Sequence, residues 1–182
     1  SWDGVADWYL GWSGASGSIH HRKLAIPVVM DLLDCRRGQQ ILDIGCGPGA
    51  LAAHVRNTGA RYTGIDLSAQ LIAFGRRHNP EARFLVGDAT RLPQHPQLRP
   101  HSFDAAIFLL SVQDIAPLDQ ALAGAAWALK PGGRLAMLMT HPCFRIPRQS
   151  GWGWDGQRKL WYRRIDRYLA ELDIPMQPHA RG

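Results

Sequence analysis

The residues best suited to hold a reactive ligand form a glycine-rich stretch after an apolar run. Residues 41–49 read Ile-Leu-Asp-Ile-Gly-Cys-Gly-Pro-Gly, so the carboxylate of Asp43 is followed by Gly45, Gly47 and Gly49. Glycines at this spacing let the backbone approach a ligand closely, because no Cβ atoms stand in the way. The helix-forming run that follows would direct its N-terminus at the same ligand. This arrangement is typical of a nucleotide-type site.

Two further carboxylates stand at the ends of short apolar runs that follow the loop. Residues 62–66 end in Asp66, roughly 20 residues after the glycines, where a carboxylate suits a bidentate grip on ribose hydroxyls. Residues 83–89 contain Asp88 at the end of another predicted strand. A single Asp at such a place is more often an ordinary helix cap or turn former. The order of these acids after the glycine loop favours a common site.

Five segments in register over residues 41–139 resemble the class I, Rossmann-like family of S-adenosylmethionine-dependent methyltransferases. Asp43, two residues before Gly45, resembles the acid of motif I in that family, and residues 102–110 and 129–139 resemble its fourth strand and its turn with the fifth strand. The resemblance implies an α/β fold, a Rossmann-like three-layer sandwich with a mostly parallel central sheet. It also implies S-adenosyl-L-methionine as cofactor and S-adenosyl-L-homocysteine as product.

The resemblance further implies which residues contact each part of the cofactor. The expected cofactor-binding residues are Asp43, Gly45, Cys46 and Gly47 for the methionine part, Asp66 for the ribose, Asp88 and Ala89 for the adenine, and Leu67 and Leu109 for the two faces of the adenine ring. Cys46 is expected to contribute its backbone and not its thiol. The sulfonium makes the methyl carbon electrophilic, so the protein mainly has to place a nucleophile in line with it.

A general base is needed only where the methyl acceptor arrives protonated and weakly acidic. His141 follows the fifth predicted strand, where the resemblance places a loop over the methyl group, so it is the candidate catalytic residue. The competing interpretation is a structural histidine that is hydrogen-bonded before Pro142. Gln113, Asp114 and Tyr9 are weaker candidates of the same kind. No metal ligand set is visible, which disfavours metal-dependent transfer.

The regular alternation of strands and helices predicts a parallel sheet covered on both faces. We expect one methyltransferase domain over residues 1–182, with an N-terminal cap and helix (1–38), a cofactor-binding core (39–140) and a substrate-side extension (141–182). Residues 24–33 have helical apolar spacing, and residues 121–129 read as a helix that ends before Pro131. Residues 11–23 are rich in Gly and Ser and are expected to form a mobile loop.

The C-terminal part is less regular. The resemblance implies a closing hairpin of two strands, but we find no two good strand candidates after residue 146. The apolar positions of residues 157–170 fit neither the helical nor the strand period. The sequence therefore leaves open whether the chain lacks this hairpin.

The net charge of +6 raises the question of nucleic-acid binding. From residue 145 onward the chain has eight Arg or Lys and four Asp or Glu, interleaved and not in a block. Residues 111–114 lack the Asn/Asp-Pro-Pro-Tyr/Phe motif of methyltransferases that act on base amino groups. We therefore expect a small-molecule substrate, with Arg145, Arg148 or Arg163 available to pair with its carboxylate or phosphate. Residues 141–148, His-Pro-Cys-Phe-Arg-Ile-Pro-Arg, resemble a segment that follows the fifth strand in a bacterial branch of the family, which we expect to be of the small-molecule type.

Composition adds limits on location. The 46% hydrophobic and 20% charged content is ordinary for a globular protein, and no apolar stretch approaches the length of a membrane span. There is no basic-then-apolar leader, and the three cysteines form no disulfide or zinc framework. These features predict a cytoplasmic protein without a membrane partner and without a metal.

Three further functions stay open at this point. An NAD-dependent oxidoreductase is favoured only by Ala50, which loosely completes a Gly-x-Gly-x-x-Ala fingerprint, and by Asp66; Asp43 and Asp88 argue against it. An RNA-directed methyltransferase is the second of these functions, and a non-catalytic fragment that binds S-adenosylmethionine is the third.

Overall fold

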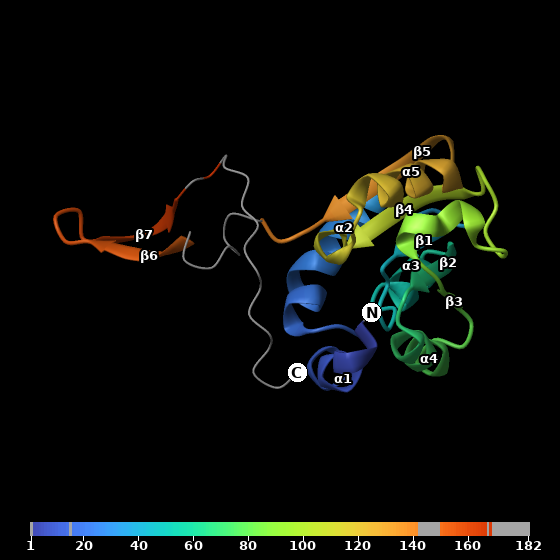
Figure 1. The fold of residues 1–182 in the computed structure, drawn as a ribbon, viewed down its shortest axis with the longest axis horizontal. Coiled ribbons are helices and arrows are strands. Elements are labelled where there is room, and N and C mark those ends of the chain that lie inside the picture. The colour runs from blue at the N-terminus through green and yellow to red at the C-terminus, as the bar shows by residue number, and fades with distance from the viewer. Residues whose placement is uncertain (1, 15, 142–149, 167, 169–182) are drawn as a thin grey trace. The chain divides into compact units, whose positions relative to one another are not determined.

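The computed structural model describes residues 2–14, 16–141, 150–166 and 168, and the chain divides into two compact units, Ser1–Met139 and Thr140–Gly182. The first unit is built on a five-stranded sheet in which every neighbouring pair is parallel, in the order β3-β2-β1-β4-β5 (Figure 1). The strands are β1 (Gln40–Ile44), β2 (Arg61–Asp66), β3 (Arg83–Val86), β4 (Phe103–Leu109) and β5 (Leu129–Leu138). The single-domain organisation expected from the sequence stays a prediction.

Helices cover both faces of this sheet. They are η1 (Trp2–Val5), α1 (Ala6–Ser13), the π-helix η2 (His21–Ala25), α2 (Ile26–Leu33), α3 (Ala52–Asn57), α4 (Ala69–His78), η3 (Ala89–Gln94), η4 (Val112–Asp114) and α5 (Leu118–Ala128). Successive strand residues point to opposite faces: Ile41 packs with α2, α3 and α4, and Leu42 packs with η3 and α5. This three-layer arrangement confirms the fold class expected from the sequence.

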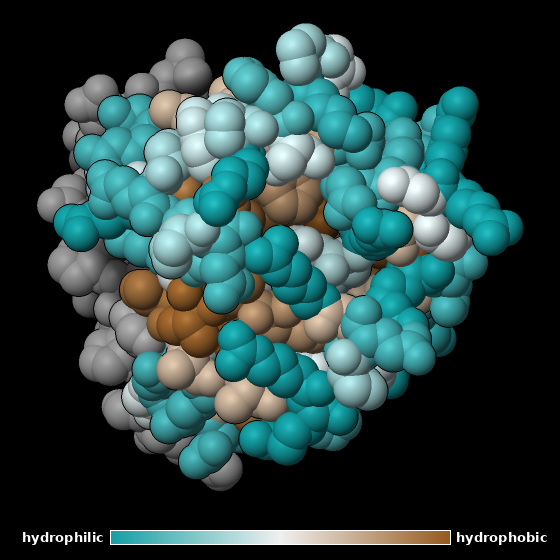
Figure 2. Space-filling view, turned by 90° about the vertical axis from the view of Figure 1, so that its right-hand side faces the viewer, coloured by the Kyte–Doolittle hydropathy of each residue, from teal (hydrophilic) through white to brown (hydrophobic). Residues whose placement is uncertain are grey.

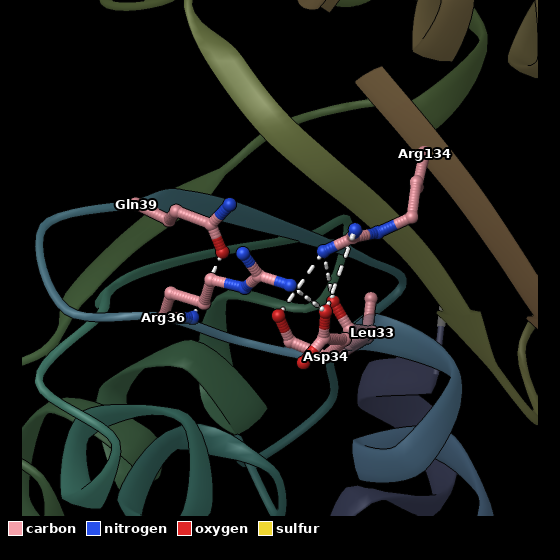
Figure 3. A network of polar contacts seen from close by, with 5 residues as sticks. All are labelled: Leu33, Asp34, Arg36, Gln39 and Arg134. Carbon is pink, nitrogen blue, oxygen red and sulfur yellow. Dashed lines mark hydrogen bonds and ion pairs between the residues drawn. The ribbon is translucent and has the colours of Figure 1, made fainter. Parts of the chain in front are cut away.

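A polar network fixes the end of α2 against the sheet (Figure 3). The guanidinium of Arg134 on β5 donates to the carbonyl oxygens of Leu33 and Asp34, which end the helix. Arg36 pairs with the carboxylate of Asp34 at 2.7 Å, and the backbone N–H of Arg36 donates to the side chain of Gln39. Carbonyls that lack a partner within the helix are thereby satisfied, and the chain is directed into β1.

The Gly- and Ser-rich residues 11–23 are only partly a loop, so the expected mobile loop is wrong at both ends. α1 continues to Ser13, and η2 begins at His21. His21 is buried, and its Nδ1 atom lies 2.9 Å from the hydroxyl of Ser18. The small residues here serve the close packing of a turn, because a Cβ on Gly17 would lie 2.6 Å from that of His21. At the other end of the core, Leu129 opens β5 and does not close α5.

The second unit contains a hairpin that the sequence analysis failed to find. β6 (Ser150–Asp155) and β7 (Leu160–Ile165) pair in antiparallel register and form a separate two-stranded sheet. Gly151 and Gly153 lower the strand propensity of β6, and neither strand has a buried face. The sequence left open whether a strand pair follows residue 146, and the structure has one, in a sheet of its own.

Candidate functional site

The glycine-rich stretch leaves β1 at the edge of the sheet where the parallel strands end. β2 lies on one side of β1 and β4 on the other, so this is the point where the strand order reverses and where doubly wound sheets bind ligands. The backbone N–H groups of Gly45 and Cys46 donate to the carbonyl of Ile65 at the end of β2, at 2.8 and 3.1 Å. On the other side the hydroxyl of Ser111, after β4, donates to the carbonyl of Ile44 at 2.6 Å. The loop is thus held from both neighbouring strands.

The three glycines of the loop all have positive φ, but they face different surroundings. A Cβ on Gly45 would lie 2.6 Å from the Cβ of Ser111, and one on Gly49 would lie 2.5 Å from the ring of Phe84. A Cβ on Gly47 would meet nothing closer than Tyr9, at 3.9 Å. Gly45 and Gly49 are therefore required by packing. Gly47 is the glycine whose open side is left for a ligand.

Asp66 at the end of β2 is tied directly to the glycine loop. One carboxylate oxygen accepts from the N–H of Gly47 and the other from the N–H of Ser68, both at 2.8 Å. Burial raises the pKa of this carboxyl, and the two N–H donors partly offset the rise. A carboxylate has about four acceptor positions, so two remain for ligand hydroxyls. The sequence expectation placed Asp66 on the ribose, and its geometry suits that role.

Asp43 is fully buried near the end of β1, with an exposed fraction of 1%. Its Oδ2 atom accepts from the phenol of Tyr62 at 2.8 Å, whereas its Oδ1 atom has no hydrogen-bond partner among the residues that the structure describes. Burial raises the pKa of this carboxyl to about 7. An unpartnered buried carboxylate oxygen is uncommon and needs an explanation. A cationic or N–H donor supplied by a ligand would provide it.

Asp88 after β3 acts as a helix cap in this structure. Its Oδ1 atom accepts from the N–H and the hydroxyl of Thr90, at 2.8 and 2.7 Å, and these bonds hold the pKa of Asp88 below its usual range. Its other oxygen faces Arg91 only at 4.0 Å. Asp88 therefore has the helix-cap role that the sequence analysis set against a ligand role, and its Oδ2 atom stays accessible. Ala89 begins η3 and packs against the core.

The remaining expected cofactor residues differ in exposure. Leu67 follows Asp66 and is 52% exposed, so its side chain is available to cover a flat ligand. Leu109 ends β4 and packs partly against the core. The thiol of Cys46 is buried and directed to the carbonyl of Gly47, in line with a backbone role for this residue. Burial raises the pKa of this thiol, so it is not poised as a nucleophile.

Two contacts from the N-terminal segment were not specified by the sequence. The hydroxyl of Ser68, which caps α4, donates to the carboxylate of Asp3. Tyr9 lies over Gly47, and burial, together with the nearby carboxylates of Asp66 and Asp114, raises the pKa of its phenol. The aromatic and acidic residues of the first turns indicate that the N-terminal segment caps the site, but they do not indicate that Asp3 meets Ser68 or that Tyr9 lies over Gly47.

The other candidates for acid–base chemistry differ in their surroundings. The side-chain amide of Gln113 donates to the carbonyl of Leu110 at 2.7 Å. His141 belongs to the second unit, where its exposed ring lies 6.1 Å from that of Tyr168. Arg145 and Arg148, expected to contact the substrate, lie outside the described residues, as does Cys143. Among the described residues no group of three or more His, Cys, Asp or Glu could hold a metal ion.

These features together define a class of protein, a doubly wound α/β domain with a nucleoside site at its switch point. A cofactor with a ribose and an amino-acid arm fits the hydrogen-bond acceptors and the free space of this site. Asp66 offers carboxylate oxygens to hydroxyls, Gly47 leaves room for close approach, and Asp43 holds an acceptor without a donor. S-adenosylmethionine has both parts, and its ammonium group is the kind of donor that Asp43 lacks.

The chain belongs to the family described as the methyltransferase domain, which matches residues 42–137. A demethylmenaquinone methyltransferase of Beutenbergia cavernae is 32% identical over 108 residues, covering 59% of this chain and 43% of that protein. A malonyl-[acyl-carrier protein] O-methyltransferase of Pectobacterium atrosepticum is 29% identical over 153 residues, covering 83% and 57%. The chain thus spans less than two thirds of the length of these curated relatives.

A solved S-adenosylmethionine-dependent methyltransferase from Mesorhizobium loti has the same fold. It superposes with a TM-score of 0.68 at 27% identity, covering 86% of this chain and 68% of that one. Family and structure therefore make S-adenosylmethionine the cofactor and confirm the class I resemblance. Within the part of the chain that the structure describes, no helix combines the length and apolar composition needed to cross a membrane.

Proposed function

We propose that this chain is the catalytic domain of an enzyme that transfers a methyl group from S-adenosylmethionine to an O, N or C atom of a small molecule. The observation that carries the proposal is the buried Asp43 with one unpartnered oxygen, beside a glycine loop that Asp66 holds open. Family membership supports methyl transfer, and the names of both curated relatives specify methyltransferases.

Each residue has a definite task in this proposal. The bound cofactor supplies an electrophilic methyl carbon. Asp43 holds the methionine ammonium, Asp66 holds the ribose hydroxyls, and Leu67 covers the adenine. Tyr9, placed over Gly47, shields the methionine side of the site from water. The chain thus positions the methyl group and leaves the in-line approach of the acceptor as the main catalytic requirement.

The acceptor is proposed only as a small molecule. The two curated relatives are named for a quinone precursor and for a malonyl carrier protein, which share little chemistry, so neither acceptor is transferred to this chain. A screen of metabolite fractions with S-adenosylmethionine that carries an isotope-labelled methyl group tests the proposal. Label in a small-molecule product supports it, and label only in RNA or protein contradicts it.

His141 stays a prediction as the general base. The change His141→Gln removes the titrating imidazole but keeps a polar side chain. If His141 is the general base, this variant should have a lower kcat with little change in KM, and its pH–rate profile should lose the acidic limb. An unchanged kcat would remove His141 from the chemistry and leave the cofactor site as proposed.

A further inference from the structure

The edge of the sheet opposite the glycine loop carries a second candidate site. The parallel strands begin there, and Figure 2 looks onto this side of the first unit, the right-hand side in Figure 1. It shows long hydrophilic side chains around a smaller hydrophobic area. β2 has six residues, so the two edges of the sheet are about 17 Å apart. A ligand at this edge would not touch the reacting methyl group.

Two adjoining clefts lie along this edge. One, of about 290 Å³, is lined at the starts of β1, β3 and β4, and the other, of about 450 Å³, at the starts of β1, β2 and β3. Gln40, Thr63 and Arg83 line both clefts, so together they form one groove, which we call the amino-edge groove. Its polar lining includes Gln40, Arg56, Arg61, Thr63, Arg83 and Arg99.

The charge of the amino-edge groove is strongly one-sided. Four arginines line it, and Glu81 is the one acidic residue in its lining among the described residues. Glu81 pairs with Arg56, and the neighbouring Asp104 pairs with Lys130 at 2.7 Å. Within the described ranges, no ion pair is found for the other three arginines of the groove. The cofactor edge has the opposite character, with Asp43, Asp66 and Asp88 at the strand ends.

The arginines of the groove retain donors for a ligand. Arg83 uses one terminal nitrogen to donate to the carbonyl of Gln97 at 2.8 Å, and Arg99 uses one to donate to the carbonyls of Pro96 and Leu98. A guanidinium has five N–H groups in a planar fork, which matches phosphate and carboxylate oxygens. These backbone bonds orient the side chains and leave the rest of each fork unused. Such orientation lowers the entropy lost when an anion binds.

We propose that the amino-edge groove binds a phosphate-bearing ligand with two or more negative charges, at a site separate from the cofactor site. Two lobes that share Arg83 suit a ligand with more than one phosphate group. The side-chain amide of Gln40, which lines both lobes, offers a neutral N–H donor to phosphate oxygens. The phosphate can belong to a small molecule or to an RNA backbone, and the experiment below separates the two.

The test is calorimetric titration of the 182-residue chain with pyrophosphate at constant ionic strength, in the parent and in Arg61→Gln. Arg61 is exposed, and its side chain has no hydrogen bond or ion pair with the described residues, so its replacement should not affect folding. Arg22→Gln, on η2, is the matched control, because it removes the same charge from an exposed site outside the groove. We expect one bound pyrophosphate, affinity reduced about tenfold in Arg61→Gln, and a change of less than about twofold in Arg22→Gln.

A second variant and a second probe complete the design. Arg83→Lys keeps the charge but loses the fork, and we expect it to weaken pyrophosphate binding while thermal unfolding still shows a folded protein. A short single-stranded RNA that binds more tightly than pyrophosphate, and loses affinity in Arg61→Gln, assigns the phosphate to a nucleic acid; failure of RNA to bind assigns it to a small molecule. The proposal is overturned if neither pyrophosphate nor the RNA binds saturably. So does an equal loss of affinity in Arg22→Gln and Arg61→Gln.

Discussion

The buried carboxyl of Asp43 makes the stability of the ligand-free protein depend on pH in a way that Asp43→Asn should abolish. Burial raises its pKa to about 7 in the folded chain, whereas an unfolded Asp titrates near about 3.9. Tyr62 donates to one oxygen, and an Asn side-chain oxygen can accept the same bond. The variant therefore keeps the shape and the bond but cannot ionise.

The sign and the size of this pH effect on stability follow from the linkage between protonation and folding. Because the folded pKa is raised, the contribution of the protonated carboxyl is complete below the unfolded pKa and is lost as the pH rises through about 7. A difference of about three pH units corresponds to about 4 kcal/mol at about 1.4 kcal/mol per unit. We expect the parent to lose about 2–4 kcal/mol relative to Asp43→Asn between about pH 5 and about pH 8.

Urea unfolding of both proteins at the two pH values measures this difference. Every other titrating group is common to parent and variant, so only the difference between their two pH dependences is interpreted. Parallel dependences would refute the reasoning, because they would mean that Asp43 ionises without penalty. With S-adenosylhomocysteine bound, the ammonium should favour the ionised carboxyl, so the affinity of the parent should rise over the same pH interval and that of Asp43→Asn should not.

Three further predictions address the rest of the site. Gly47→Ala should lower the free energy of unfolding by only about 1–2 kcal/mol, the cost of a left-handed residue, but weaken S-adenosylhomocysteine binding at least about tenfold. Gly49→Ala should instead destabilise the fold itself, because its Cβ would collide with the ring of Phe84. Urea unfolding measures the stability of both variants, and calorimetry measures their binding. Asp66→Ala should weaken S-adenosylhomocysteine binding by about 2–4 kcal/mol, and calorimetry showing unchanged affinity would remove it from the site. Tyr62→Phe leaves the second oxygen of the buried carboxyl without its donor and should cost about 1–3 kcal/mol in unfolding at neutral pH, a loss that an unchanged urea midpoint would contradict.

The sequence was sufficient for the parts of the fold that local chemistry determines. The strand that ends before Gly45, the positive φ of the loop glycines and the Ser68 cap all follow from residue types over a few positions. The same local signals place Asp43 and Asp66 at one edge of a parallel sheet.

Contacts between residues distant in sequence could not be derived in this way. The bond from Tyr62 to Asp43 joins neighbouring strands, and that from Ser68 to Asp3 spans 65 positions. Sequence patterns indicate which residues share a face, but not which polar atoms meet. The hairpin of β6 and β7 was missed for a different reason. Its glycines lower the strand propensity, and its exposed tryptophans leave neither strand with the buried face that identifies a half-buried strand.

The most direct test of the central claim is calorimetric titration of the parent chain and of Asp66→Ala with S-adenosylhomocysteine and, separately, with NADH. If the glycine loop, Asp43 and Asp66 form an S-adenosylmethionine site, the parent binds one S-adenosylhomocysteine per chain, the variant binds it at least about tenfold more weakly, and neither binds NADH. Binding of NADH in place of S-adenosylhomocysteine, or S-adenosylhomocysteine binding that is indifferent to Asp66, would contradict the account.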